Sequence, residues 1–118
     1  MTKKPILVLI AALSLSFSSH RAFAAIQVVT TLPDFAWAAR QIGGDKVEVH
    51  SLLKGNENPH YADAVPEFIR LTADADVVCL AGMELEVGWL PKVLARSGNA
   101  KVQPGGKGYC DLSKKVDA

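Results

Sequence analysis

The feature that most constrains the fold is the alternation of strand-like and helix-like segments along the chain. β-Branched residues favour strands, whereas apolar residues spaced three and four positions apart favour helices. Strand candidates at residues 26–31, 46–53, 76–82 and 100–103 alternate with helix candidates between them. This order predicts right-handed βαβ units, and therefore an α/β fold with a parallel sheet and helices on both faces.

The individual segments carry different strengths of signal. Residues 76–82 contain a continuous apolar run, which is typical of a central parallel strand covered on both faces. Residues 100–103 form the weakest strand candidate. Helices are predicted from Pro33 to the Gly43–Gly44 pair, over residues 63–73 and over residues 89–99. The apolar face of the first helix is predicted to consist of Phe35, Ala38, Ala39 and Ile42.

The N-terminus has the pattern of a secretory signal peptide over residues 1–24. Lys3 and Lys4 precede an apolar stretch at residues 5–17, and Ala22 and Ala24 form a small-residue cleavage site. The apolar stretch is shorter than the roughly 20 residues that a membrane span requires. The residue directly after the cleavage site is Ala25 and not the cysteine that lipidation requires, so we expect a mature product, residues 25–118, that is periplasmic, not lipidated and not inserted in the membrane.

Charge and motif content argue against several functional classes. Signal cleavage changes the formal charge from +1 to −2, and no basic stripe is present to neutralise nucleic-acid phosphates. The segment at residues 105–109, Gly-Gly-Lys-Gly-Tyr, lacks the spacing of a phosphate-binding loop and is interpreted as a flexible turn. No nucleophile elbow or dinucleotide fingerprint is present, so the sequence predicts no enzyme and no catalytic residues.

Polar residues follow two of the predicted strands, at the sheet edge where ligands bind in folds of this class. His60 lies in the loop at residues 53–63, directly after Pro59, and is a candidate metal ligand through its imidazole. Glu84 and Glu86 follow the third strand, where the simplest interpretation is an exposed carboxylate pair at a helix start. His50 shares a strand face with Glu48 and is interpreted as a solvated histidine.

The remaining notable side chains are two cysteines and two tryptophans. Cys79 and Cys110 could form a disulfide in an oxidising compartment, or Cys79 could be a buried thiol, and sequence leaves both interpretations open. Trp37 and Trp89 are both expected to pack in or near the core.

The order of these pieces resembles a known family of proteins. The stretches that carry the likeness are "VVTTLPDFAWAARQIGGDKVEVHSLLKGNENPHYAD", "LTADADVVCLAGMELEVGWLPKVL" and "QPGGKGYCDLS". Their combination of an Ile-Gly-Gly-Asp turn, a Pro-His loop and a Gly-x-x-x-Glu segment followed by Trp-Leu resembles the N-terminal lobe of periplasmic substrate-binding proteins of zinc and manganese ABC importers. The resemblance covers nearly all of residues 25–118.

The resemblance implies specific expectations for function. It implies a receptor that captures zinc, or alternatively manganese, and passes it to the membrane permease of an ABC importer. His60 matches the first metal-ligating histidine of the family, whereas Glu84 and Glu86 match a structural stretch. Family members have a second lobe that supplies the other ligands, and we expect this C-terminal lobe to be absent from residues 25–118. The alternative function is a metal-free lobe that acts as an interaction or adhesion module.

Overall fold

A computed structural model describes residues 23–117 of the protein, and the predicted signal peptide lies almost entirely outside this range. The strands are β1 (Ile26–Thr30), β2 (Val47–Ser51), β3 (Val77–Leu80) and β4 (Tyr109–Asp111). The α-helices are α1 (Pro33–Gly43), α2 (Pro66–Ala73) and α3 (Leu90–Ser97), with short 3-10 turns at η1 (Gly44–Lys46), η2 (Ala100–Val102) and η3 (Leu112–Lys115). None of the helices within residues 23–117 has the length and apolar character needed to span a bilayer.

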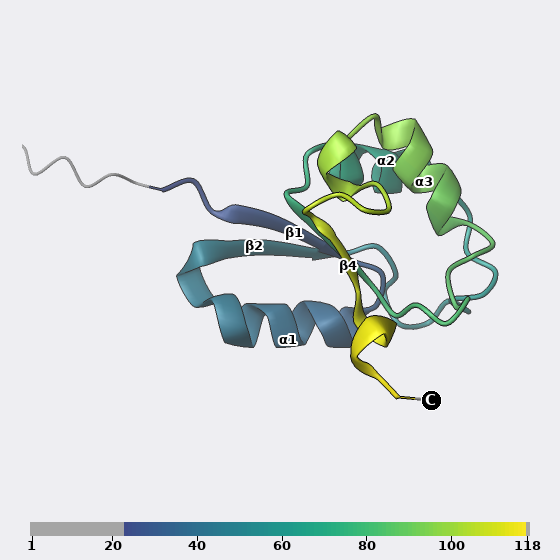
Figure 1. The fold of residues 1–118 in the computed structure, drawn as a ribbon, viewed down its shortest axis with the longest axis horizontal. Helices are drawn as coiled ribbons and strands as arrows, with labels where there is room; N and C mark the ends of the chain where they lie inside the picture. Colours follow the sequence, from purple (N-terminus) through teal and green to yellow (C-terminus); the bar gives the residue numbers. More distant parts are fainter. Residues whose placement is uncertain (1–22, 118) are drawn as a thin grey trace, which may run out of the picture.

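The four strands form one parallel sheet in the order β2-β1-β3-β4. Helix α1 covers one face of this sheet, and α2 and α3 cover the other (Figure 1). Strand β3 lies between β1 and β4, as its continuous apolar run predicts. The predicted α/β fold with a parallel sheet and helices on both faces is therefore confirmed.

Each face of the sheet has its own hydrophobic cluster. The larger cluster lies between the sheet and helices α2 and α3, and its fully buried members include Val29, Leu53, Val78, Trp89 and Val93. The smaller cluster lies under α1 and consists of Val28, Ala36 and Val49, with Ala39, Val47 and Val77 packed against it. Side chains alternate between the two clusters along β1 and β3, because successive strand residues point to opposite faces.

The buried face of α1 differs from the predicted one. Ala36 is buried and Ala39 packs beside it, whereas Ile42 is 88% exposed and Trp37 is 64% exposed. The predictions that Ile42 lies on the buried face and that Trp37 packs in or near the core are therefore wrong. The small residues Ala36, Ala39 and Gly43, spaced three and four positions apart, form the face of α1 that lies against the sheet, and a Cβ on Gly43 would overlap the side chain of Val47. Trp37 follows Ala36 and Ile42 precedes Gly43, so both lie outside this face and are exposed.

The fourth strand lies later in the chain than predicted. Residues 100–102 form the 3-10 turn η2, and the strand that pairs with β3 is β4, after the glycine-rich turn. Gly106 donates to the carbonyl of Gln103 at 2.7 Å and Gly108 donates to that of Lys101 at 2.9 Å. A Cβ on Gly108 would overlap the carbonyl oxygen of Asp76, so glycine at this position lets β4 reach β3.

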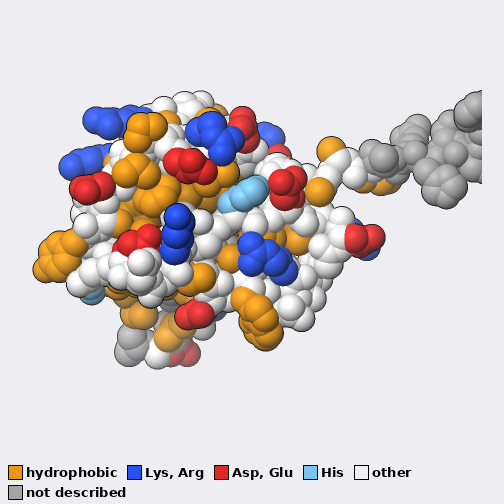
Figure 2. Space-filling view, turned by 180° about the vertical axis from the view of Figure 1, so that it is seen from behind, with side chains coloured by type: hydrophobic (Ala, Val, Ile, Leu, Met, Phe, Trp, Pro, Cys, Tyr) orange, Lys and Arg blue, Asp and Glu red, His pale blue; other side chains and the backbone are white. Residues whose placement is uncertain are grey.

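Two other elements are shorter than predicted. Helix α2 begins at Pro66, which occupies its first turn, and the predicted start at residue 63 belongs to the preceding loop. Residues 83–89 form turns, so α3 begins only at Leu90. His50 and Glu48 lie together on the edge strand β2, with 3.4 Å between Nε2 and Oε1 and both side chains solvent-accessible, as predicted. On the molecular surface shown in Figure 2, acidic, basic and apolar side chains are mixed.

Asp76 joins β1, β3 and η2 at the amino-terminal edge of the sheet. Its carboxylate accepts hydrogen bonds from the backbone N–H of Gln27 at 2.9 Å and from Lys101 Nζ at 3.0 Å. The Gln27 N–H, and then the Lys101 ammonium, hold the pKa of Asp76 below its ordinary value. The ionised carboxylate therefore stabilises the folded state.

This arrangement predicts how stability changes in acid. Because the folded-state pKa lies below the unfolded one, the contribution is present above about pH 4 and is lost as pH falls through the folded-state value. We expect Asp76→Asn to reduce the loss of stability between about pH 5 and pH 2, measured as urea midpoints. Asp74→Asn, two residues away, is the control. Equal acid sensitivity in all three proteins would contradict the prediction.

Candidate metal-binding site

The candidate site lies at the carboxyl-terminal edge of the sheet, where the parallel strands all end. The loop after β2 carries His60, and the loop after β3 carries Glu84 and Glu86. The hydrogen bonds of Leu52 N–H to Thr30 O and of Leu53 N–H to Thr31 O extend the β1–β2 pairing to the start of the first loop. The topology therefore brings the two polar loops of the sequence analysis to one edge, as predicted for a ligand site in this class of fold.

His60 is exposed on a loop whose backbone is well held. Its N–H donates to Asn58 Oδ1 at 3.0 Å, and the N–H of Tyr61 donates to Asn58 O at 3.0 Å. The rings of His60 and Tyr61 lie 6.1 Å apart at their centroids. None of the hydrogen bonds among residues 23–117 involves a ring nitrogen of His60. The imidazole is thus available to an external ligand.

Trp89 connects the His60 loop to the loop after β3. Its indole Nε1 donates to the carbonyl oxygen of Pro59 at 2.7 Å, and its ring packs against Phe68 with centroids 5.7 Å apart. The backbone of Gly88 also approaches His60 closely, since a Cβ there would lie 3.1 Å from His60 O. The predicted core position of Trp89 is confirmed, because its side chain is 1% exposed. The structure adds its contact with the histidine loop.

Glu86 is buried, so the interpretation of Glu84 and Glu86 as an exposed pair is wrong for Glu86. Its side chain is 2% exposed. Glu86 Oε1 accepts from Thr31 Oγ1 at 2.7 Å and from the N–H of Ala81 at 2.6 Å, and Oε2 accepts from the N–H of Gly82 at 3.1 Å. Three donors therefore surround a carboxylate that is an acceptor only. Glu86 joins the ends of β1 and β3, which agrees with a structural role.

Glu84 keeps the exposed position that the sequence suggested, in an unusual backbone conformation. Met83 and Glu84 have φ angles of 50° and 65°, in the left-handed region that residues other than glycine seldom adopt. Gly82 precedes them with a φ of 80° and lies so close to Asp111 and Ser113 that a Cβ would overlap both side chains. The loop after β3 thus turns sharply, which directs Glu86 inward and Glu84 outward.

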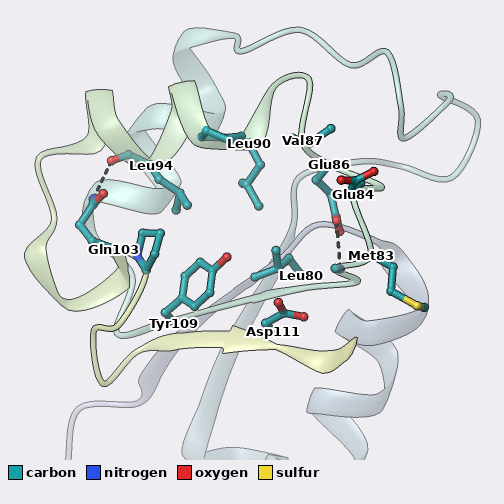
Figure 3. A pocket seen from close by; sticks show the side chains of 13 residues that line it. Leu80, Met83, Glu84, Glu86, Val87, Leu90, Leu94, Gln103, Tyr109 and Asp111 are labelled. Carbon is teal, nitrogen blue, oxygen red and sulfur yellow. Dashed lines mark hydrogen bonds between the residues drawn. The ribbon is translucent and has the colours of Figure 1, made fainter. Parts of the chain in front are cut away.

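A cavity of about 440 Å³ adjoins the loop after β3, and His60 is not among the residues that line it. It lies between α3 and β4 and is mostly apolar, with Leu80, Leu90 and Leu94 in its wall. Figure 3 shows the Tyr109 side chain directed into it and the Met83 side chain directed away. Burial, together with Asp111 and Glu86, raises the pKa of Tyr109. Because metal ions are bound by nitrogen, oxygen or sulfur ligands, this mostly apolar cavity is not a candidate metal site.

Sequence reasoning missed two contributions to this edge. The hydrogen bond from Trp89 to the Pro59 carbonyl joins residues 30 positions apart, and the bond that Glu86 accepts from Thr31 joins residues 55 positions apart. The available signal was the Gly-x-x-x-Glu spacing followed by Trp-Leu, which marks a fixed arrangement without saying what it contacts. Across the part of the chain that the structure describes, no three His, Cys, Asp or Glu residues cluster closely enough to hold a metal ion.

Comparison with known proteins identifies the family of this chain. The sequence profile of the family described as "Zinc-uptake complex component A periplasmic" (ZnuA) matches residues 28–117. The chain belongs to the ZnuA family. The likeness seen in the Pro-His loop and in the Gly-x-x-x-Glu segment is therefore confirmed.

Curated relatives of this ZnuA-family chain are metal ABC transporter substrate-binding proteins. It is 32% identical to the metal ABC transporter substrate-binding lipoprotein FimA of Streptococcus parasanguinis, over 85% of this chain and 32% of that one. It is 32% identical to the manganese ABC transporter substrate-binding lipoprotein PsaA of Streptococcus pneumoniae, over 64% of this chain and 26% of that one. These relatives are substrate-binding components and not enzymes, so the interpretation of the chain as non-enzymatic is confirmed.

Solved structures share the fold of this chain. A crystal structure of ZnuA matches with a TM-score of 0.59 and 30% identity, over 64% of this chain and 30% of that one. The periplasmic zinc binding protein TroA from Treponema pallidum matches with a TM-score of 0.58 and 23% identity, over 65% of this chain and 27% of that one. The chain thus spans about a third or less of the length of the relatives it matches.

Proposed function

We propose that residues 25–118 are the N-terminal lobe of a substrate-binding component that captures a divalent metal ion. The metal would then pass to the membrane permease of an ABC importer. Residues 1–24 would direct export, which places the lobe in the periplasm. Membership of the ZnuA family supports this proposal, as do the names of the relatives, which are metal ABC transporter substrate-binding proteins.

The observation that carries the proposal is the position of His60. Its imidazole is exposed at the carboxyl-terminal edge of the sheet. Its backbone N–H donates to Asn58, and Trp89 donates to the carbonyl of the preceding residue, Pro59. A ligand fixed in this way loses little conformational freedom when it binds a metal. In this proposal His60 donates a ring nitrogen to the ion.

Zinc is our first choice of metal, and manganese is the alternative. Imidazole suits zinc, whereas manganese prefers carboxylate and carbonyl oxygens. The matching family is named for zinc uptake, and PsaA is named for manganese. The imidazole of His60 favours zinc. The exposed carboxylate of Glu84, on the neighbouring loop, is of the type that manganese prefers, and it accepts no hydrogen bond from the described residues.

One imidazole does not make a complete site, because zinc is generally held by three or four protein ligands. We propose that the other ligands belong to a second lobe outside residues 25–118. Complete structural zinc sites bind the ion with a free energy of about 10–16 kcal/mol. This chain alone should therefore bind zinc far more weakly, in roughly the millimolar range, which corresponds to about 4 kcal/mol.

A zinc titration followed by NMR of the histidine side chains tests the role of His60. We expect zinc to shift the ring-nitrogen signals of His60 first, with half-saturation at roughly millimolar metal. His60→Ala should abolish this response. His50→Ala is the matched control, because His50 lies in a strand beside Glu48 and should leave the His60 response unchanged.

Two outcomes would contradict the proposal in different ways. Equal responses of His50 and His60, or none at all, would remove the reason for assigning His60 as a ligand and would favour the metal-free interaction module. Tight, stoichiometric zinc binding by this chain alone would show that its own residues complete the site, and would overturn the assignment of the other ligands to a second lobe.

A further inference from the structure

The two cysteines of the chain lie side by side in the sheet. Cys79 is in the central strand β3 and Cys110 is in the edge strand β4, and the two are direct partners in the parallel pairing of these strands. Both thiols are free and half-buried. They are also the only cysteines in the sequence, so neither has another partner within the chain.

The side chains of both cysteines point to the same face of the sheet. Val78 and Leu80 belong to the larger cluster under α2 and α3, so the alternation of side chains places Cys79 on the α1 face. Tyr109, the partner of Val78, packs against that larger cluster, so Cys110 is on the α1 face as well. The two thiols therefore face each other across one strand spacing.

The spacing of paired strands suits a disulfide. Neighbouring strands are about 4.8 Å apart, and disulfides join residues whose Cα atoms are about 4.4–6.8 Å apart. Burial, and then the neighbouring Cys110 thiol, raise the pKa of Cys79 to about 12, so Cys79 carries its proton at neutral pH. Closing the bond thus requires a small adjustment of side chains and no movement of one strand past another.

We propose that Cys79 and Cys110 form a disulfide that links the edge strand β4 to β3. The thiolate of Cys110 attacks an external disulfide, forms a mixed disulfide and releases one reduced thiol. The Cys79 sulfur then loses its proton and attacks Cys110 Sγ, which releases the second reduced thiol. The two protein thiols lose two electrons and two protons in total, and the oxidant, a protein or small-molecule disulfide, accepts them.

The bond would secure the least supported strand of the sheet. β4 has only three residues and pairs with β3 alone. Its residues Tyr109 and Asp111 line the cavity beside α3 (Figure 3). Asp111 also lies against Gly82 at the sheet edge. A disulfide at Cys110 would therefore fix the position of β4, whose Asp111 packs against the loop after β3. This inference is independent of the metal-binding proposal.

Oxidised glutathione is the probe for the test. Incubating the purified protein with it should lower the intact mass by about 2 Da, the mass of two hydrogens, and leave no titratable thiol. Peptide mapping should find the peptides of Cys79 and Cys110 joined within one chain. Reduction should then lower the Tm by roughly 10 °C, because the closed loop no longer restricts the unfolded state.

The single variants Cys79→Ser and Cys110→Ser provide the controls. Each should lose the dependence of Tm on redox state and should instead add glutathione or form dimers between chains. Two thiols that stay reduced in the wild-type protein, or that form only glutathione adducts and bonds between chains, would overturn the proposal. The mass and peptide measurements require no variant, so the test holds even if a variant folds poorly.

Discussion

Replacing Trp89 with alanine is expected to lower the free energy of unfolding by about 3–5 kcal/mol, the usual cost of removing a large buried aromatic side chain. The indole is 1% exposed, packs against Phe68 and donates to the Pro59 carbonyl. Small domains have a total stability of about 5–15 kcal/mol. The substitution would therefore remove much of the stability of this lobe, measured by urea unfolding followed by circular dichroism.

Two further variants separate the causes of this loss. Trp89→Phe keeps most of the packing but leaves the Pro59 carbonyl without its donor, so we expect a smaller loss of about 1–3 kcal/mol. Trp37→Ala is the matched control, because this tryptophan is 64% exposed and should change stability by less than about 0.5 kcal/mol. Similar losses from Trp37→Ala and Trp89→Ala would show that the assigned burial is wrong.

The second large effect is expected at Glu86. Replacing it with leucine leaves the part-buried N–H of Ala81 and the buried N–H of Gly82 without an acceptor, at about 1–3 kcal/mol for each unsatisfied group. We therefore expect a total loss of at least about 2 kcal/mol in the free energy of unfolding. Glu86→Gln should cost less, because its carbonyl oxygen can still accept from Thr31 and Ala81, while its amide faces the Gly82 N–H.

Glu84 provides the control for this experiment. It lies two residues away on the same loop and is exposed, so Glu84→Gln should change the urea midpoint little. Hydrogen exchange adds a local measurement, since loss of the Glu86 carboxylate should speed exchange of the Ala81 and Gly82 amides selectively. If Glu86→Leu lowers the urea midpoint no more than Glu84→Gln does, the three hydrogen bonds of Glu86 contribute nothing to stability.

Two predictions from sequence failed for the same physical reason. The tryptophans were expected to behave alike, as were the two glutamates, because each pair has a similar local context. Trp37 is exposed because α1 packs on the sheet through Ala36 and Ala39, and Glu86 is buried on a loop that turns at Met83 and Glu84 and brings its carboxylate to Thr31 and Ala81. Both outcomes depend on how elements pack, which residue type and spacing do not encode locally.

The site was predicted in part. His60 was selected by its place after a strand, and the structure puts it at the predicted edge, where its imidazole has no hydrogen bond to the described residues. Its role as a ligand stays a prediction. The loop's connection to Trp89 could not be predicted, because the donor lies 30 residues beyond the Pro59 carbonyl. The fourth strand was misplaced for a related reason: the glycines that admit β4 act through close backbone approaches to Asp76 and Lys101.

The sequence by itself determined the class of fold and the edge that carries the candidate ligand. Alternating strand and helix patterns require parallel pairing, and parallel strands direct the loops that follow them to one edge. Only the tertiary structure decided which tryptophan and which glutamate are buried, where β4 lies and that Cys79 faces Cys110. Periodicity is a property of neighbouring residues, whereas burial and strand register depend on segments far apart in the chain that pack together.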